Sequence, residues 1–378
     1  MKVLMICTEK LPVPPIRGGA IQTYISGVAP FLSRKHKLTV LGRTDPSLPK
    51  QETINGIRYV RVEGGLMETY IKEVVKFLRK NAFDVIHIFN RPRLVLPVRK
   101  VAPNARIVLS MHNDMFGPDK IKRKEAKKAI KEVRHIITVS NYVGEKISEL
   151  YPEAASKIRT VYSGVDVKRF VPFWESKKAK KVRRRLRRKY KLGSRKIILF
   201  VGRISPKKGA DVLVRAMYKL KKRHRNPALV IVGGKWYSVD KLSDYMAYVR
   251  SLAERSPIPV VTTGYVPADQ IHQWFWAGDI FVCTSQWEEP LARVHYEAMA
   301  AGLPFVTTRR GGNPEVVKNK NGLVVDRPED PKAFVKPITK LLSNKKLRRE
   351  MGKNGRHLAL KQFQWKRVAK EVEAVWEP

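Results

Sequence analysis

Cysteine, acidic residues and long apolar runs are all scarce in this sequence. Its 378 residues include two cysteines, Cys7 and Cys283, each within a short apolar stretch. That usage suggests neither a disulfide framework nor a zinc site. No apolar run approaches the ~20 residues that span a bilayer. The apolar stretch at residues 1–7 is too short for a signal peptide and meets Glu9 and Lys10 at once. We therefore expect a cytoplasmic protein whose chain opens with a buried strand.

Basic residues greatly outnumber acidic ones. The chain has 77 Lys and Arg against 33 Asp and Glu, a formal net charge of +44. The cations are concentrated at 177–191, with further runs at 120–134 and 345–349. Each run alone is typical of a solvated helix face, but together they predict attraction to an anionic partner, either a membrane surface or a polymer such as a glycan. Specific nucleic-acid binding is not expected, because no recognition helix or aromatic RNA-binding motif is visible.

Short apolar runs alternate with helical segments in two separate series. The chain is long enough for two domains with substantial cores. This rhythm predicts an α/β protein with doubly wound parallel sheets. The expected strands are 3–6, 38–41, 57–62, 85–88, 107–111, 136–139 and 158–161 in the first series, and 197–201, 229–232, 260–263, 279–284 and 305–308 in the second. We expect Rossmann-like domains at 1–172 and 196–362, a basic interdomain segment at 173–195, and a C-terminal helix at about 363–378 that packs back on the first domain.

Two carboxylates lie in the unit of strand, loop, helix and strand that includes residues 285–317. Glu289 and Glu297 are separated by seven residues. Glu289 follows a strand directly, at the carboxyl end where open α/β sheets bind ligands. From residue type alone, both glutamates are better interpreted as ordinary solvated charges than as site residues.

A helix that contains Glu297 is expected between Glu289 and the next strand. Pro290 suits its first turn, the run 291–301 consists of good helix formers, and Gly302 ends it. The backbone N–H groups at its start, at Leu291 and Ala292, would suit an anion.

A second candidate site follows strand 197–201, where Gly202, Arg203 and Lys208 surround a tight turn before a helix. Two cations beside a helix start suit a diphosphate. The motif is weak alone, and Lys207 is an alternative to Lys208.

The first half carries a paired glycine and a histidine of interest. Gly18 and Gly19 precede a helix and would let the backbone approach a bound group, although an ordinary turn would look the same. His112 follows strand 107–111, where a lone histidine is more often structural than catalytic. Alternation along strand 85–88 points His87 into the fold, and Asp166 is expected to cap local structure.

Taken together, these motifs resemble those of retaining glycosyltransferases of family 4, also called group 1. The resemblance covers nearly the whole chain and rests on Glu289, Glu297, Ala298–Met299–Ala300, Gly302, Pro304, Gly311–Gly312 and Glu315. It implies the GT-B fold, in which two Rossmann-like domains face a cleft. It also implies transfer of a sugar, with retention, from a nucleotide-diphosphate sugar that we expect to be UDP-linked. No other cofactor is implied.

The resemblance also assigns roles in the second domain. Arg203 and Lys208, next to Gly202, would hold the donor diphosphate in place of a metal, since no Asp-x-Asp metal motif is present. Glu297 would bind the ribose hydroxyls and Glu289 the sugar hydroxyls, with the helix start at 291–292 near the phosphates.

In the first domain, the resemblance implies that Gly18, Gly19 and His112 face the donor, and that the Pro-rich stretch before Gly18 borders the acceptor.

Segments 7–25 and 288–304 resemble the glycosyltransferase-like spore coat proteins of Bacillus-type bacteria. This implies an envelope or coat-associated acceptor and a place at a membrane periphery or spore coat. It leaves open a non-catalytic structural or binding protein of an anionic surface. The intact set of Arg203, Lys208, Glu289 and Glu297 favours a working enzyme.

Overall fold

The computed structural model describes residues 1–221, 226–235 and 242–377. The chain divides into two compact units. Unit 1 is Met1–Gly164 together with the segment from Trp365 onwards, and unit 2 is Val165–Gln364. The basic segment 173–195, expected between two domains, lies inside unit 2. No helix among the described residues is long and apolar enough to cross a membrane.

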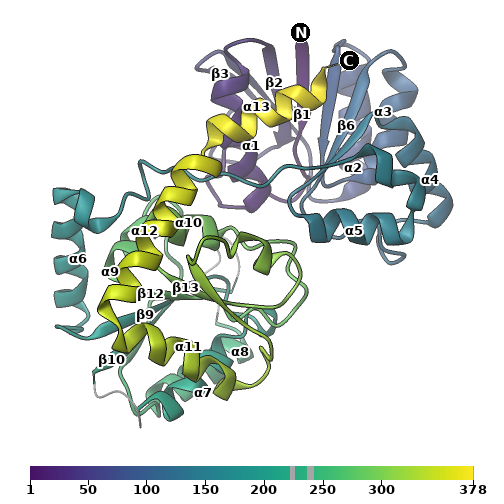
Figure 1. The fold of residues 1–378 in the computed structure, drawn as a ribbon. Helices are drawn as coiled ribbons and strands as arrows, with labels where there is room; N and C mark the ends of the chain where they lie inside the picture. Colours follow the sequence, from purple (N-terminus) through teal and green to yellow (C-terminus); the bar gives the residue numbers. More distant parts are fainter. Residues whose placement is uncertain (222–225, 236–241, 378) are drawn as a thin grey trace. The chain divides into compact units, whose positions relative to one another are not determined.

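Unit 1 is built on an eight-stranded sheet in the order β3-β4-β2-β1-β5-β6-β7-β8 (Figure 1). Its strands are β1 (Lys2–Ile6), β2 (Lys37–Arg43), β3 (Gln51–Ile54), β4 (Ile57–Val62), β5 (Val85–Phe89), β6 (Arg106–Met111), β7 (His135–Thr138) and β8 (Ile158–Thr160). All neighbours pair in parallel except β3 and β4. The order reverses between β1 and β5, so the carboxyl ends of these two strands form a topological switch point.

Helices cover both faces of this sheet (Figure 1). They are α1 (Ala20–Leu32), α2 (Met67–Leu78), α3 (Val95–Val101), α4 (Arg123–Glu132), α5 (Asn141–Leu150) and α13 (Trp365–Trp376). One apolar cluster packs α1 and α13 on the sheet, and another packs α2 to α5 on the opposite face. Within the first cluster, the buried Trp376 donates its indole N–H to His87 Nδ1 at 3.2 Å. The C-terminal helix is therefore an integral part of the core of unit 1.

Unit 2 has a six-stranded parallel sheet in the order β11-β10-β9-β12-β13-β14. The strands are β9 (Lys196–Val201), β10 (Pro227–Val232), β11 (Val260–Thr262), β12 (Ile280–Val282), β13 (Phe305–Thr308) and β14 (Gly322–Val325). The helices are α6 (Lys177–Lys189), α7 (Ala210–Leu220), α8 (Asp244–Glu254), α9 (Ile271–Ala277), α10 (Val294–Ala300), α11 (Pro331–Ser343) and α12 (Lys345–Gln362). Its switch point lies between β9 and β12, so the loops after these strands lie side by side.

The helix expected at 291–301 is shorter than its sequence suggests. α10 begins at Val294, so Leu291 and Ala292 precede the helix and the prediction of a helix start there was wrong. The reason is tertiary. Ala292 N–H donates to Asn313 Oδ1 at 3.1 Å, and the Glu289 carbonyl accepts from Gly312 N–H at 2.8 Å. These bonds hold the segment against a neighbouring loop and prevent it from joining the helix.

Candidate functional site

A buried ion pair joins the two loops at the switch point of unit 2. Lys208 Nζ lies 2.5 Å from Glu289 Oε2. The same oxygen accepts hydrogen bonds from Ser285 Oγ and Trp287 Nε1, both at 2.8 Å. The Glu289 side chain is 9% exposed and that of Lys208 is 18% exposed. The structure thus brings two of the predicted site residues together as a fixed, partly enclosed pair.

The environment of Glu289 keeps it ionised. Burial would raise the pKa of this carboxyl, but the charge of Lys208 and the hydrogen bonds from Lys208, Ser285 and Trp287 outweigh burial. The pKa of Glu289 therefore lies below its ordinary value of 4.5. At neutral pH the site holds a carboxylate and not a proton donor.

The turn after Lys208 requires glycine. Gly209 has φ +66°, and a Cβ there would lie 2.4 Å from the Thr284 carbonyl oxygen. Thr284 Oγ1 donates to the Lys208 carbonyl at 2.8 Å, so the two loops are tied through their backbones. This geometry also separates the two lysines, because Lys207 Nζ lies over the Trp287 ring, 4.9 Å from its centroid. Lys208, and not Lys207, is the lysine that reaches the carboxylate.

The paired glycines after β13 position Glu289 from the other side. Gly311 has φ +53°, and a Cβ there would lie 2.0 Å from the Glu289 carbonyl oxygen. Gly312 N–H donates to the same carbonyl oxygen. Any side chain at Gly311 would displace the Glu289 backbone, which explains the Gly-Gly pair at this distance from the carboxylate.

Glu297 lies in the first turn of α10 and has the opposite electrostatic setting. Its side chain is 16% exposed, and Arg293 Nη2 approaches Glu297 Oε1 to only 3.9 Å. Burial raises the pKa of Glu297 above 4.5, and the charges of Arg293 and Arg169 do not offset it. The two glutamates therefore differ: a lysine lowers the pKa of Glu289, whereas burial raises the pKa of Glu297.

Gly202 and Arg203 lie in the same β9–α7 loop as Lys208. Gly202 N–H donates to the Val232 carbonyl at 3.0 Å, which extends the β9–β10 ladder. Arg203 follows immediately and is half-buried. The loop therefore carries two predicted cations, five residues apart, at the carboxyl end of a central strand.

The predicted glycines of unit 1 have backbone conformations that suit glycine. Gly18 and Gly19 have φ +84° and +108° and lead directly into α1. A Cβ on Gly19 would lie 2.2 Å from Gln22 Oε1. The turn is consequently tight, as the paired glycine predicted, whether or not a ligand approaches it.

His112 follows β6, as expected, and its ring packs edge-on against Tyr24 at 4.9 Å between centroids. Its backbone N–H donates to Asn90 Oδ1 at 3.0 Å. His87, predicted to be structural, is fully buried and contacts Ser110 Oγ at 2.6 Å. Burial lowers the pKa of His87 to about 3, so it is neutral at physiological pH. The predicted capping role of Asp166 is also confirmed, since its Oδ1 accepts the backbone N–H groups of 168 and 169.

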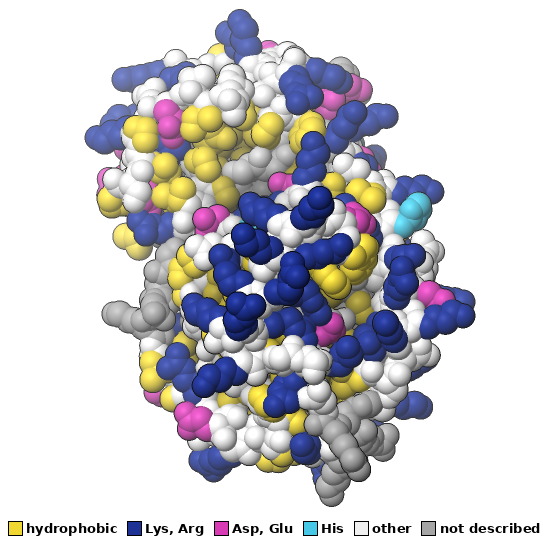
Figure 2. Space-filling view, turned by 90° about the vertical axis from the view of Figure 1, so that its left-hand side faces the viewer, with side chains coloured by type: hydrophobic (Ala, Val, Ile, Leu, Met, Phe, Trp, Pro, Cys, Tyr) yellow, Lys and Arg dark blue, Asp and Glu magenta, His cyan; other side chains and the backbone are white. Residues whose placement is uncertain are grey.

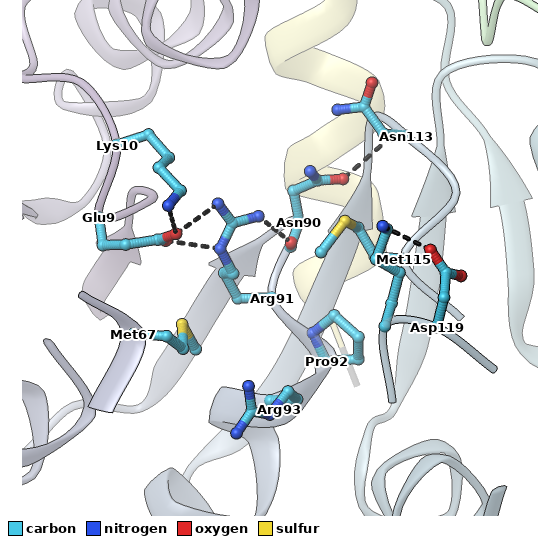
Figure 3. Close-up of a pocket in the computed structure, with 11 residues that line it drawn as sticks. Glu9, Lys10, Met67, Asn90, Arg91, Pro92, Arg93, Asn113, Met115 and Asp119 are labelled. Atoms are coloured by element: carbon cyan, nitrogen blue, oxygen red, sulfur yellow. Dashed lines mark hydrogen bonds and ion pairs between the residues drawn. The ribbon is translucent and has the colours of Figure 1, made fainter. Parts of the chain in front are cut away.

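A pocket of about 480 Å³ lies in unit 1 and was not predicted from the sequence (Figure 3). It occupies the switch point between β1 and β5 and is lined by Glu9, Lys10, Met67, Asn90, Arg91, Pro92, Arg93, Asn113, Met115, Asp119 and Lys120. Arg91 donates two hydrogen bonds to the Glu9 carboxylate, from Nε to Oε2 at 2.6 Å and from Nη2 to Oε1 at 2.9 Å. Burial would raise the pKa of Glu9, but Arg91 holds it below its ordinary value.

Asn90 lines this pocket and binds the loop that follows β6 (Figure 3). It has φ +56°, and its Oδ1 accepts the backbone N–H groups of His112 and Asn113, each at 3.0 Å. The loop that carries His112 is thereby attached to the end of β5. A position directly after a central strand was the one signal that could have indicated Asn90 and Arg91 beforehand.

In the part of the chain that the structure describes, no group of three or more His, Cys, Asp or Glu side chains could hold a metal ion.

Two Rossmann-like domains in one chain are the architecture of the GT-B fold of glycosyltransferases. HepE from Anabaena, solved in complex with UDP-glucose, has this fold. It superposes with a TM-score of 0.77 at 18% identity, over 99% of this chain and 98% of that one.

Sequence comparison identifies the family. Residues 182–358 match the model of group 1 glycosyl transferases, and residues 18–169 match that of glycosyltransferase family 4. YtcC of Bacillus subtilis is 43% identical over 378 residues, which is 100% of this chain and 92% of YtcC. Spore coat protein SA of the same organism is 42% identical over 378 residues, covering 100% and 99% of the two chains. The chain therefore belongs to the group 1, family 4 glycosyltransferases.

Proposed function

We propose that this protein transfers a sugar, with retention of configuration and without a metal ion, from a UDP-linked donor to an envelope or coat-associated acceptor. The observation that carries the proposal is the buried Lys208–Glu289 pair at the switch point of unit 2. A complex with UDP-glucose is known for HepE, which shares the fold. The name of spore coat protein SA supports the coat or envelope setting.

Lys208 and Arg203 would stabilise the leaving nucleoside diphosphate. Breakage of the bond between sugar and phosphate develops negative charge on the phosphate oxygens, and fixed cations lower the energy of that transition state. The ammonium of Lys208 is held in place by Glu289 before any donor arrives. Little reorganisation is then needed during the reaction. Gly202, directly before Arg203, keeps the backbone of this loop free of a side chain near the phosphates.

Glu289 would orient the transferred sugar. Within the described residues, all three hydrogen bonds to its carboxylate fall on Oε2. We propose that Oε1 accepts from sugar hydroxyls. Glu297 would bind the ribose hydroxyls, with which a carboxyl of raised pKa can still exchange hydrogen bonds. No side chain serves as covalent nucleophile in this scheme, and the acceptor attacks from the face that the leaving phosphate vacates.

In unit 1, we propose that Gly18, Gly19 and His112 contribute to donor binding, on the basis of the family resemblance. The pocket beside Asn90 would hold the acceptor. Its ionised Glu9 and the amides of Asn90 and Asn113 are groups that hydrogen-bond hydroxyls, as a carbohydrate acceptor requires.

The proposal is tested by incubating the protein with UDP-sugars in the presence of a chelator and following the released or transferred sugar by proton NMR. We expect turnover without metal and a product with the anomeric configuration of the donor. An inverted product would exclude the retaining mechanism. Turnover that depends on added Mg²⁺ or Mn²⁺ would exclude the proposal that Arg203 and Lys208 take the place of a metal ion.

A second candidate is a non-catalytic structural or binding protein of an anionic surface, which the basic helix α6 favours. A complete absence of hydrolysis and transfer across UDP-, GDP- and ADP-sugars, in a folded protein, would support it over the enzyme.

A further inference from the structure

Helix α6 has an extreme composition. Ten of its 13 residues are Lys or Arg and none is acidic. Its three apolar residues, Ala179, Val182 and Leu186, recur at the spacing of one helix face, and Ala179 and Leu186 are buried. Ser176 accepts the Ala179 N–H at 3.2 Å and caps the helix start. α6 is thus an ordinary amphipathic helix whose polar face is purely cationic.

Two of the arginines belong to the buried side. Arg183 Nη1 donates to the carbonyl oxygens of Trp276, Ala277 and Gly278 at 2.7, 2.8 and 2.7 Å. Arg183 also forms a 2.7 Å ion pair with Asp279, which Arg187 joins at 3.4 Å. These arginines fix α6 on the end of α9. Their charges are neutralised or bound within the unit and are not available to a partner.

The remaining cations form what we call the basic face of α6, namely the exposed Lys177, Lys178, Lys180, Lys181, Arg184, Arg185, Arg188 and Lys189. Figure 2 shows Lys and Arg side chains crowded over this part of unit 2. A 13-residue helix is about 20 Å long, so the charges are spread along a straight, convex surface. None of the exposed residues of the helix is apolar or aromatic, and the half-buried Tyr190 just after it lies under Lys189, whose Nζ is 5.4 Å from the ring centroid.

This arrangement opposes helix stability. Lys180, Arg184 and Arg188 follow one another at four-residue steps, and like charges at that spacing repel. Scattered charges would give the same solubility without the repulsion. A dense field of anions next to the helix would remove it.

We propose that the basic face of α6 docks this protein on the surface of an anionic lipid bilayer. Many headgroup phosphates in one plane match a straight row of cations. The helix itself carries no aromatic side chain, and the half-buried Tyr190 at its end already packs against Trp274. This disfavours single-stranded nucleic acid, whose bases stack on aromatic rings. The lack of apolar side chains means that the helix lies on the headgroups without inserting. Docking of this kind does not depend on whether the protein transfers sugar.

The test is co-sedimentation of the full chain with vesicles of phosphatidylcholine alone, and with phosphatidylglycerol added, across a salt series. We expect association only with the anionic vesicles, falling steeply as salt screens the exposed charges. Absence of association at low salt would overturn the proposal. Tighter binding to RNA or to an anionic glycan than to these vesicles would overturn the choice of a bilayer.

A charge-matched pair of variants assigns the effect to α6. Replacing Lys180, Lys181, Arg184 and Arg188 by Gln should weaken vesicle binding by about tenfold or more. The control replaces Arg123, Lys124, Lys128 and Lys131 of α4, which are also exposed, and changes the net charge equally. It should retain most of the binding, and neither variant should melt below the wild type, since the α6 substitutions remove only repulsion between like charges. Equal losses in the two variants would show that only bulk charge matters and would refute a specific role of α6.

Discussion

Lys208 Nζ and Glu289 Oε2 lie 2.5 Å apart although the two residues are 81 positions apart in the chain. Their contact links the loops of two adjacent strands, β9 and β12, at the point where the sheet order of unit 2 reverses. Because the pair is largely enclosed, each charge depends on the other for its stability in the folded protein.

Replacing Lys208 by Met should destabilise the protein by about 3 kcal/mol, because it leaves the Glu289 carboxylate buried without its cation. The measurement is urea unfolding at neutral pH. Lys207→Met, which removes an exposed lysine on the Trp287 ring, is the matched control and should cost much less. Equal midpoints for the two variants would contradict the assignment of the ion pair.

The same pair predicts a pH dependence. The folded pKa of Glu289 is depressed, so its contribution to stability is present above the unfolded value of about 4.5 and is lost as pH falls through the folded pKa. The difference in unfolding free energy between wild type and Lys208→Met should therefore shrink below pH 4.5. A difference that stays constant from neutral pH into this acid range would show that the ion pair is not its source.

Glu297→Gln should separate stability from function. Burial raises the folded pKa of Glu297, so the folded protein makes its ionisation less favourable than water does, and a neutral amide there should leave the melting temperature equal or higher. Turnover of a UDP-sugar should nevertheless fall, because a charge-assisted hydrogen bond of about 1.5–3 kcal/mol to the donor is lost. The check is to measure melting and kcat/KM on the same preparation. An unchanged kcat/KM would remove Glu297 from the donor site.

UDP should raise the melting temperature in the presence of a chelator. At a hundred times the dissociation constant, a ligand that binds only the folded state stabilises it by about 2.7 kcal/mol. The physical reason is that Arg203 and Lys208 already supply cations for the diphosphate. Uridine, which lacks the phosphates, is the control and should shift the melting temperature far less. A shift that appears only with added divalent metal would contradict this prediction.

Arg183→Gln should destabilise unit 2 by about 3 kcal/mol, whereas Arg184→Gln on the exposed side should change little. Arg183 satisfies the last carbonyl groups of α9 and neutralises Asp279, while Arg184 points to solvent. Thermal melting of the two variants, which have the same net charge, measures the difference. Similar melting temperatures would mean that α6 is held by its apolar side alone.

Much of the fold could be predicted because short stretches of sequence specify its helices and strands. The central strands of both sheets are continuous apolar runs, and such runs identify buried parallel strands whatever surrounds them. The strands that were missed lack this signal. β3 is an exposed edge strand that pairs antiparallel with β4, and β14 begins at a glycine. The placement of Glu289 and Lys208 in loops also followed from local order, since each comes soon after a strand, but their contact with each other did not.

Local sequence patterns therefore specify the periodicity of the elements, the two α/β series and the residue types at the strand ends. Tertiary structure alone decided where α10 begins, because the bonds from Asn313 and Gly312 hold the preceding segment out of the helix. It alone decided that Arg183 and Arg187 are structural within an apparently uniform basic run, and that Glu9 meets Arg91 in a pocket. Each of these outcomes depends on a partner distant in the sequence, and no local pattern specifies which distant group will neutralise a charge or accept a hydrogen bond.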